Sequence, residues 1–141
     1  MFDHWNRKIE YLRISVTDRC SLRCRYCMPA EGVRSLAHAD ILTYDEIVRA
    51  AGALTALGVK KIRLTGGEPL VRKNLSELVA MLAALPTRPR LVLTTNAIAL
   101  AENVAELKAA GLSGVNVSLD TLSPEIFERI TRRSGPLLAQ A

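Results

Sequence analysis

The amino-acid sequence predicts an α/β fold built on a parallel sheet, either an open doubly wound sheet or part of a barrel. Short apolar segments typical of strands alternate with amphipathic helical segments through the chain. Connections between such strands are right-handed crossovers, which place the strands parallel in one sheet. The 141 residues, 49% of them hydrophobic, fit one globular domain with a substantial core.

Four strands are expected, each a short run rich in apolar and β-branched residues. They cover residues 11–16, 59–64, 90–95 and 114–119. An irregular segment, residues 17–30, follows the first strand and contains all three cysteines of the chain. The cysteines are therefore expected on a loop just past the end of a strand.

Helices are expected after the cysteine segment and after each later strand. They cover residues 44–57, 75–84, 102–110 and a last segment that begins at Pro124. The expected N-caps are Thr43, Asn74 and Ser123, and the terminating glycines are Gly58 and Gly111. Glu46 completes a T-x-x-E capping box with Thr43, and Glu77 stands at the same spacing from Asn74.

Polar and glycine-rich residues follow every expected strand. They are Thr17 and Asp18, residues 65–68, residues 94–96 and residues 118–120. Ligands of parallel sheets bind beyond the carboxyl ends of the strands, so these residues should converge on one face. No strand signal follows residue 132, so a barrel of this kind would be incomplete. Its last strand would be an open edge through which copies could associate.

The net charge of +5 comes mostly from arginine, and Arg19, Arg23 and Arg25 crowd around the cysteines. Such a local cluster favours a small anionic ligand over nucleic acid, although a solvated basic face is the better explanation of the charge alone. Charged residues interrupt Met1–Ser15, so a secretion signal is not expected in this stretch. The longest apolar run, residues 78–85, is too short to span a membrane, so a cytoplasmic protein is expected.

The three cysteines are the strongest chemical signal in the sequence. Cys20, Cys24 and Cys27 lie within eight residues, which fits poorly with a secreted disulfide framework. Three thiolates in so short a loop can hold an iron–sulfur cube and leave one iron free. Zinc is an alternative, but His38 does not stand at a common spacing for a fourth ligand. A redox pair or buried structural cysteines are further alternatives, and a redox pair leaves Cys20 unexplained.

The segment Cys20-Ser-Leu-Arg-Cys-Arg-Tyr-Cys27 resembles the C-x3-C-x-aromatic-C motif of the radical S-adenosylmethionine superfamily. Other segments are similar to the GTP 3′,8-cyclase family of molybdenum cofactor biosynthesis. They are Tyr11-Leu-Arg-Ile-Ser-Val-Thr-Asp-Arg-Cys20, Arg63-Leu-Thr-Gly-Gly-Glu-Pro69, Thr94-Thr-Asn96 and Asn116-Val-Ser-Leu-Asp120. The resemblance covers residues 8–133. It implies that residues 8–141 form one domain, the N-terminal part of a radical enzyme core. The fold implied for this domain is an incomplete TIM-like barrel.

The resemblance implies a lyase that converts GTP to a cyclised pterin precursor with a [4Fe–4S] cluster and S-adenosylmethionine. Reduction of the cluster then breaks a C–S bond of S-adenosylmethionine and starts radical chemistry, with the cofactor doing the difficult step. The implied cluster ligands are Cys20, Cys24 and Cys27, the S-adenosylmethionine contacts Tyr26, Gly67 and Ser118, and the GTP contacts Arg13, Arg63 and Thr94. No side chain is implied as an acid or base.

Arg13 and Arg63 are both expected to face a barrel interior, because side chains alternate between the two faces along a strand. A buried arginine needs an anionic partner, which a triphosphate would supply. The alternative is an ion pair, Arg63 with Glu68 or Arg13 with Asp18. Glu68 itself is expected to accept hydrogen bonds from an ammonium group. The arginines near the cysteines could help to keep the thiols ionised, and simple surface charge is an equally good explanation of them.

The sequence departs from the family in two respects. Ala97 stands where a glycine usually follows Thr-Thr-Asn, and the family's second cysteine cluster and C-terminal glycine pair have no counterpart. The 141 residues alone are therefore expected to be incomplete for the full reaction. Two other functions remain open. The first is a radical enzyme that acts on another small molecule or on a peptide. The second is a zinc-binding module without catalysis. The electron donor is not identified.

Overall fold

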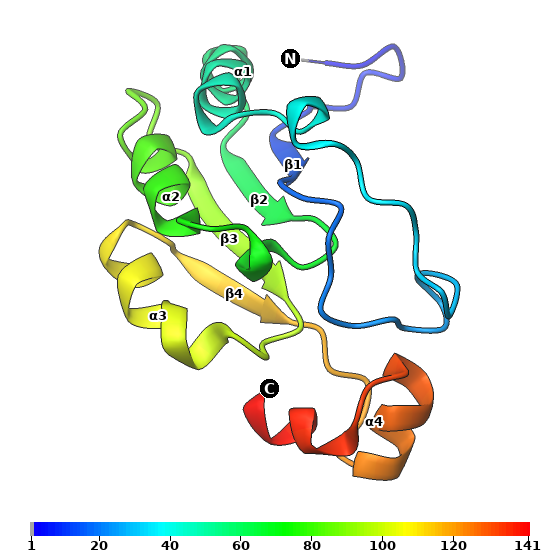
Figure 1. Cartoon of the computed structure of the whole chain (residues 1–141). Helices are drawn as coiled ribbons and strands as arrows, with labels where there is room; N and C mark the ends of the chain where they lie inside the picture. Colours follow the sequence, from blue (N-terminus) through cyan, green and yellow to red (C-terminus); the bar gives the residue numbers. More distant parts are fainter. Residues whose placement is uncertain (1) are drawn as a thin grey trace.

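A computed structural model describes residues 2–141 as one four-stranded sheet in which all strands are parallel. The strands are β1 (Tyr11–Ser15), β2 (Lys61–Thr65), β3 (Arg90–Thr95) and β4 (Gly114–Val117), and they lie side by side in chain order. Figure 1 shows the sheet with β1 and β4 at its edges. The predicted parallel α/β fold is confirmed, with strand ends that differ by one or two residues.

The start of β2 differs from the prediction because Val59 belongs to the preceding turn. Its amide donates to Leu54 O at 3.2 Å, while the amides of Lys60 and Lys61 both donate to Glu10 O, at 2.8 and 3.1 Å. Pairing with β1 therefore begins at Lys61, which stands opposite Tyr11.

The helices are α1 (Tyr44–Ala56), α2 (Leu75–Ala83), α3 (Leu100–Ala109) and α4 (Pro124–Thr131). The described residues also include three short 3₁₀ helices, η1 (His38–Asp40), η2 (Pro69–Val71) and η3 (Gly135–Gln140). No helix within residues 2–141 is long and apolar enough to cross a membrane.

The capping prediction is confirmed at α1 and α4. Glu46 N donates to Thr43 Oγ1 at 3.3 Å and Thr43 N donates to Glu46 Oε2 at 2.7 Å, which completes the capping box. Ser123 Oγ accepts from Ile126 N at 3.5 Å.

The predicted side-chain cap of α2 is wrong. Asn74 takes a left-handed conformation, with φ of 56°, and its side chain makes no capping hydrogen bond. Its amide group donates instead to the Glu77 carboxylate at 3.0 Å. The left-handed turn directs the Asn74 side chain toward Glu77 rather than toward the free amides of the first turn.

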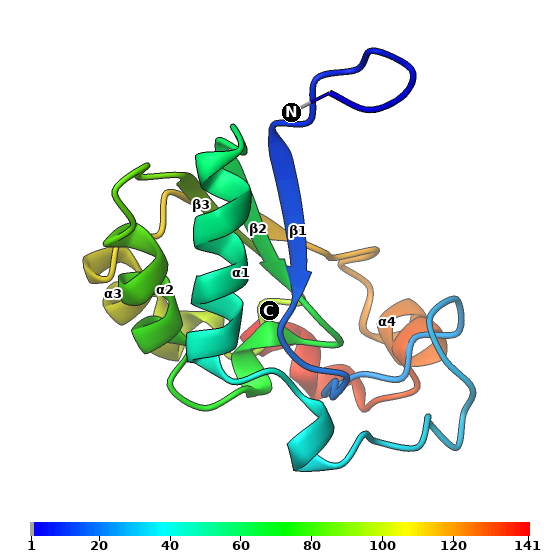
Figure 2. The same cartoon turned by 90° about the horizontal axis from the view of Figure 1, so that it is seen from above.

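The core lies between the sheet and α1, α2 and α3, which cover one face (Figures 1 and 2). Alternate strand residues supply the sheet side of this core: Ile62 and Leu64 from β2, Leu91 and Leu93 from β3. The helices contribute Ile47, Ala51, Leu78, Val79, Leu82 and Leu107. The intervening strand residues, among them 13 and 63, therefore face the side opposite the three helices.

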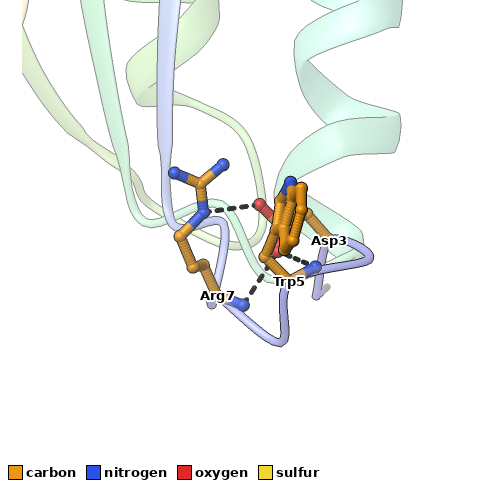
Figure 3. A network of polar contacts seen from close by, with 3 residues as sticks. All are labelled: Asp3, Trp5 and Arg7. Atoms are coloured by element: carbon orange, nitrogen blue, oxygen red, sulfur yellow. Dashed lines mark hydrogen bonds and ion pairs between the residues drawn. The ribbon is translucent and has the colours of Figure 1, made fainter.

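A closed loop precedes β1 at the amino end of the sheet (Figure 3). The Asp3 carboxylate accepts from the amides of Trp5 and Arg7, both at 2.9 Å, and from Arg7 Nε at 2.7 Å. These bonds lower the pKa of Asp3. The loop lies at the opposite end of β1 from the cysteines.

Candidate functional site

An open pocket of about 210 Å³ lies at the carboxyl ends of the strands. Seven of the predicted site residues line it: Cys20, Cys24, Cys27, Tyr26, Gly67, Thr94 and Ser118. They come from the cysteine segment, from the β2 turn and from the ends of β3 and β4, so the expected convergence on one face occurs. The predicted GTP contacts Arg13 and Arg63 do not line this pocket.

The three cysteines are free thiols in this pocket, with Cys20 and Cys24 half-buried and Cys27 exposed. Among residues 2–141, no three His, Cys, Asp or Glu side chains are grouped so that they could hold a single metal ion. This arrangement gives no support to a zinc site, where all ligands bind one ion. An iron–sulfur cube fits better, because each of its thiolates binds a different iron and the sulfurs need not converge on one point.

Burial raises the pKa of the Cys20 and Cys24 thiols above their ordinary values. The positive charge of Arg23 acts on Cys20 in the opposite direction but has a smaller effect than burial. Arg23 thus helps to ionise Cys20 as expected, but burial outweighs this help. Arg23 has a structural role, since its Nη1 donates to Cys20 O at 2.7 Å and to Leu22 O at 2.9 Å.

We predict that Cys20 and Cys24 of the metal-free chain react slowly with iodoacetamide at neutral pH and faster as the pH rises. The thiolate is the reactive form, and a raised pKa moves its formation to higher pH. Cys27 should be alkylated first because it is exposed. Peptide mass spectrometry of samples quenched over time gives the three rates, and equal rates at pH 7 would contradict the prediction.

The glycine turn after β2 packs directly against the start of the cysteine segment. Gly67 N donates to Thr17 O at 2.8 Å, and Glu68 N donates to Arg19 O at 2.7 Å. A Cβ atom on Gly66 would lie 2.6 Å from Thr17 O, and one on Gly67 would clash with Arg19 O. Only glycine permits this close approach, which fixes the start of the cysteine segment to the sheet.

The Glu68 carboxylate has a role that the sequence did not predict. It is only 3% exposed and accepts from Thr95 Oγ1 at 2.7 Å, Asn96 N at 2.7 Å and Leu70 N at 3.0 Å. The bonds from Thr95 and Asn96 join the ends of β2 and β3. The expectation that this carboxylate accepts from an ammonium group stays a prediction, because three internal donors leave acceptor capacity on a residue that lines the pocket.

Tyr26 is 67% exposed, and its hydroxyl donates to Asp120 Oδ2 at 2.7 Å. This hydrogen bond raises the pKa of Tyr26. It also connects the cysteine segment to the residues after β4, 94 positions away in the sequence. Both side chains line the pocket, so the ring of Tyr26 is held at its rim.

Arg13 and Arg63 stand directly opposite each other in the register of β1 and β2, on the face away from the core helices. Arg63 Nη1 donates to Thr94 Oγ1 at 2.6 Å, and Arg63 Nε is buried without a hydrogen-bond partner. The ion pairs found within residues 2–141 involve only Asp3 and Glu10 as acids, so neither suggested pair, with Glu68 or with Asp18, forms.

The expected burial of Arg13 is wrong, since its side chain lies exposed while that of Arg63 is half-buried. β1 is an edge strand, and within the described part of the chain no helix layer covers this face of the sheet. The sequence interpretation also missed Lys61 and Arg90, which pair in register one layer below Arg63 on the same face. The two-residue alternation along β2 and β3 would have found them.

Residues 14–137 match the Radical SAM superfamily. The chain is 54% identical over 132 residues to a GTP 3′,8-cyclase of Geobacter sulfurreducens and 56% identical over 132 residues to one of Peptoclostridium acidaminophilum. These matches cover 94% of the chain but 40% and 41% of the relatives, so the chain spans about two fifths of their length.

The fold resembles that of HydG, described as a maturase of the [FeFe]-hydrogenase. The TM-score is 0.68 at 20% identity, with 96% of this chain and 31% of HydG covered. Together with the cysteine spacing and the parallel sheet, the match over residues 14–137 shows that the chain belongs to the Radical SAM superfamily.

Proposed function

We propose that residues 8–141 form part of a radical enzyme core in which Cys20, Cys24 and Cys27 hold a [4Fe–4S] cluster. The observation that carries this proposal is that all three thiols line one pocket at the carboxyl ends of parallel strands. When bound, the cluster supplies the electron that breaks a C–S bond of S-adenosylmethionine. Three protein ligands leave one iron for that molecule.

Tyr26, Gly67 and Ser118 are the proposed contacts of S-adenosylmethionine, because they line the same pocket as the thiols. Gly67 presents backbone without a side chain, which permits close approach of a ligand. Asp120 holds the ring of Tyr26 at the rim. The residues of the chain thus bind and orient the molecule, and the chemistry of bond cleavage belongs to the cluster.

We further propose that the substrate is GTP and that the whole enzyme converts it to a cyclised pterin precursor in molybdenum cofactor biosynthesis. The relatives carry the name GTP 3′,8-cyclase. Arg13 and Arg63 stand opposite each other on neighbouring strands, and neither has a carboxylate partner among residues 2–141. Two like charges so placed are unfavourable, and a bound triphosphate would relieve the repulsion. Thr94 orients Arg63 through its hydroxyl.

Anaerobic reconstitution with iron and sulfide tests the cluster. Iron with acid-labile sulfide supports it, whereas zinc without sulfide would favour a zinc-binding module. A cluster signal in electron paramagnetic resonance that responds to S-adenosylmethionine would show an open iron. If the chain binds S-adenosylmethionine but not GTP, a radical enzyme with another small molecule or a peptide as substrate is the better conclusion.

We predict that Arg63→Ala weakens GTP binding by about tenfold or more without changing the iron content. A charge-assisted hydrogen bond of this kind contributes about 1.5–3 kcal/mol. Isothermal titration calorimetry gives the dissociation constant, and iron analysis of the same sample gives the cluster content. Arg129→Ala is the matched control, because Arg129 is an exposed arginine on α4. A variant that loses iron or unfolds would contradict a role in substrate binding.

A further inference from the structure

Hydrogen bonds hold the cysteine segment against the carboxyl end of α4, and each of the two segments donates to the other. Two are between backbones, Arg23 N to Thr131 O at 2.9 Å and Arg25 N to Ile130 O at 3.0 Å. A third runs from Arg133 Nε to Ser21 O at 3.0 Å. α4 therefore forms a support for the segment that carries the thiols.

Arg132 donates hydrogen bonds on either side of the stretch that carries Cys24 and Cys27. Its Nη1 donates to Arg23 O at 3.1 Å and to Met28 O at 2.9 Å. Arg23 and Met28 are the residues immediately outside the stretch from Cys24 to Cys27. One guanidinium nitrogen thus holds both ends of that stretch.

The backbone of Arg132 is in a conformation that arginine rarely adopts. It forms the C-cap of α4 with φ of 53°, a left-handed geometry that usually selects glycine or asparagine. A strained residue persists where the surrounding structure holds it, and such residues gather at functional sites. Here the left-handed turn coincides with a guanidinium group that donates twice to the cysteine segment.

We propose that Arg132 is a positioning residue for the iron–sulfur cluster. Its guanidinium group pre-orders the turn from Cys24 to Cys27, so that the two thiols need less reorganisation when they bind iron. This inference rests on the proposed cluster, and Arg132 itself touches neither the thiols nor the iron. It acts through the carbonyl groups of Arg23 and Met28.

The test compares three variants of the full chain. Arg132→Gly removes the guanidinium group and suits the left-handed turn. Thr43→Ala destabilises the fold at the distant capping box of α1, and Arg129→Ala removes an exposed charge from α4. The measured quantity is the chelator concentration that removes half of the iron from each reconstituted protein, with thermal unfolding of the metal-free chain recorded in parallel.

Arg132→Gly is expected to lower this chelator concentration by about tenfold, the usual size of an outer-shell effect on metal affinity. Thr43→Ala and Arg129→Ala are expected to retain iron as the unaltered chain does. In the metal-free chain, trypsin should cleave after the exposed Arg25 faster in Arg132→Gly than in either control.

Normal iron retention in Arg132→Gly would overturn the inference. So would equal losses in Arg132→Gly and Thr43→Ala, because retention would then follow overall stability. If the unaltered chain binds no iron at all, the proposed function fails and this inference fails with it. Faster cleavage in Arg132→Gly would in that case show only a structural role for the contact.

Discussion

Replacing any one of Cys20, Cys24 and Cys27 by serine is expected to abolish stable binding of an iron–sulfur cluster. Each thiol would bind a different iron, so no neighbouring cysteine can replace the lost ligand. The chain has only these three cysteines, and none of the described histidines lines the pocket that contains them. Iron and acid-labile sulfide, measured per chain after anaerobic reconstitution, should fall close to zero in each variant.

Ser21→Ala is a suitable control for the cysteine variants. It removes a hydroxyl from the same segment, where Ser21 Oγ accepts from Asn96 Nδ2 at 3.1 Å, and leaves all three thiols in place. This variant should keep its iron. Full iron and sulfide content in any one of the cysteine variants would show that the replaced thiol is not a ligand.

The sheet was predictable from the sequence because its signals are local. Strand runs, the capping box of Thr43 and Glu46 and the terminating glycines each depend on residues a few positions apart. The convergence of the strand ends then follows from parallel topology alone. For the same reason the glycine and serine residues at the strand ends were predictable on one face of the sheet, where they line one pocket with the cysteines.

The contacts that order the site were not predictable, because they join residues far apart in the sequence. Tyr26 meets Asp120 across 94 positions, and Arg132 meets Met28 across 104. No local pattern selects one such partner among several polar residues. The internal hydrogen bonds of Glu68 were missed for the same reason, since its donors at the end of β3 become visible only once the two strands lie side by side.

The environment of Arg13 was mispredicted for a different reason. Alternation gives the face on which a side chain lies, and this part of the prediction agrees with the register of β1 and β2. It does not say whether anything covers that face. In this structure the core helices cover only the opposite face, so Arg13 is exposed.

The largest effect on activity is expected because the face of the sheet opposite the core helices is uncovered. We predict that these 141 residues alone release deoxyadenosine slowly from S-adenosylmethionine but form no cyclised nucleotide from GTP. β1 and β4 each pair with a strand on one side only, and the exposed Arg13 leaves one of the proposed GTP contacts in water. A nucleotide held so loosely cannot keep its ribose within reach of a radical.

Small displacements are costly in such chemistry, since a shift of about 1 Å can lower a rate about a hundredfold. The test is an anaerobic assay with dithionite, S-adenosylmethionine and GTP, in which mass spectrometry follows deoxyadenosine and the cyclised nucleotide separately. The full-length cyclase of Geobacter sulfurreducens, of which the chain covers 40%, serves as the positive control. Cyclised product at a rate comparable to that control would refute the prediction, because it would mean that four strands suffice to hold GTP against the radical.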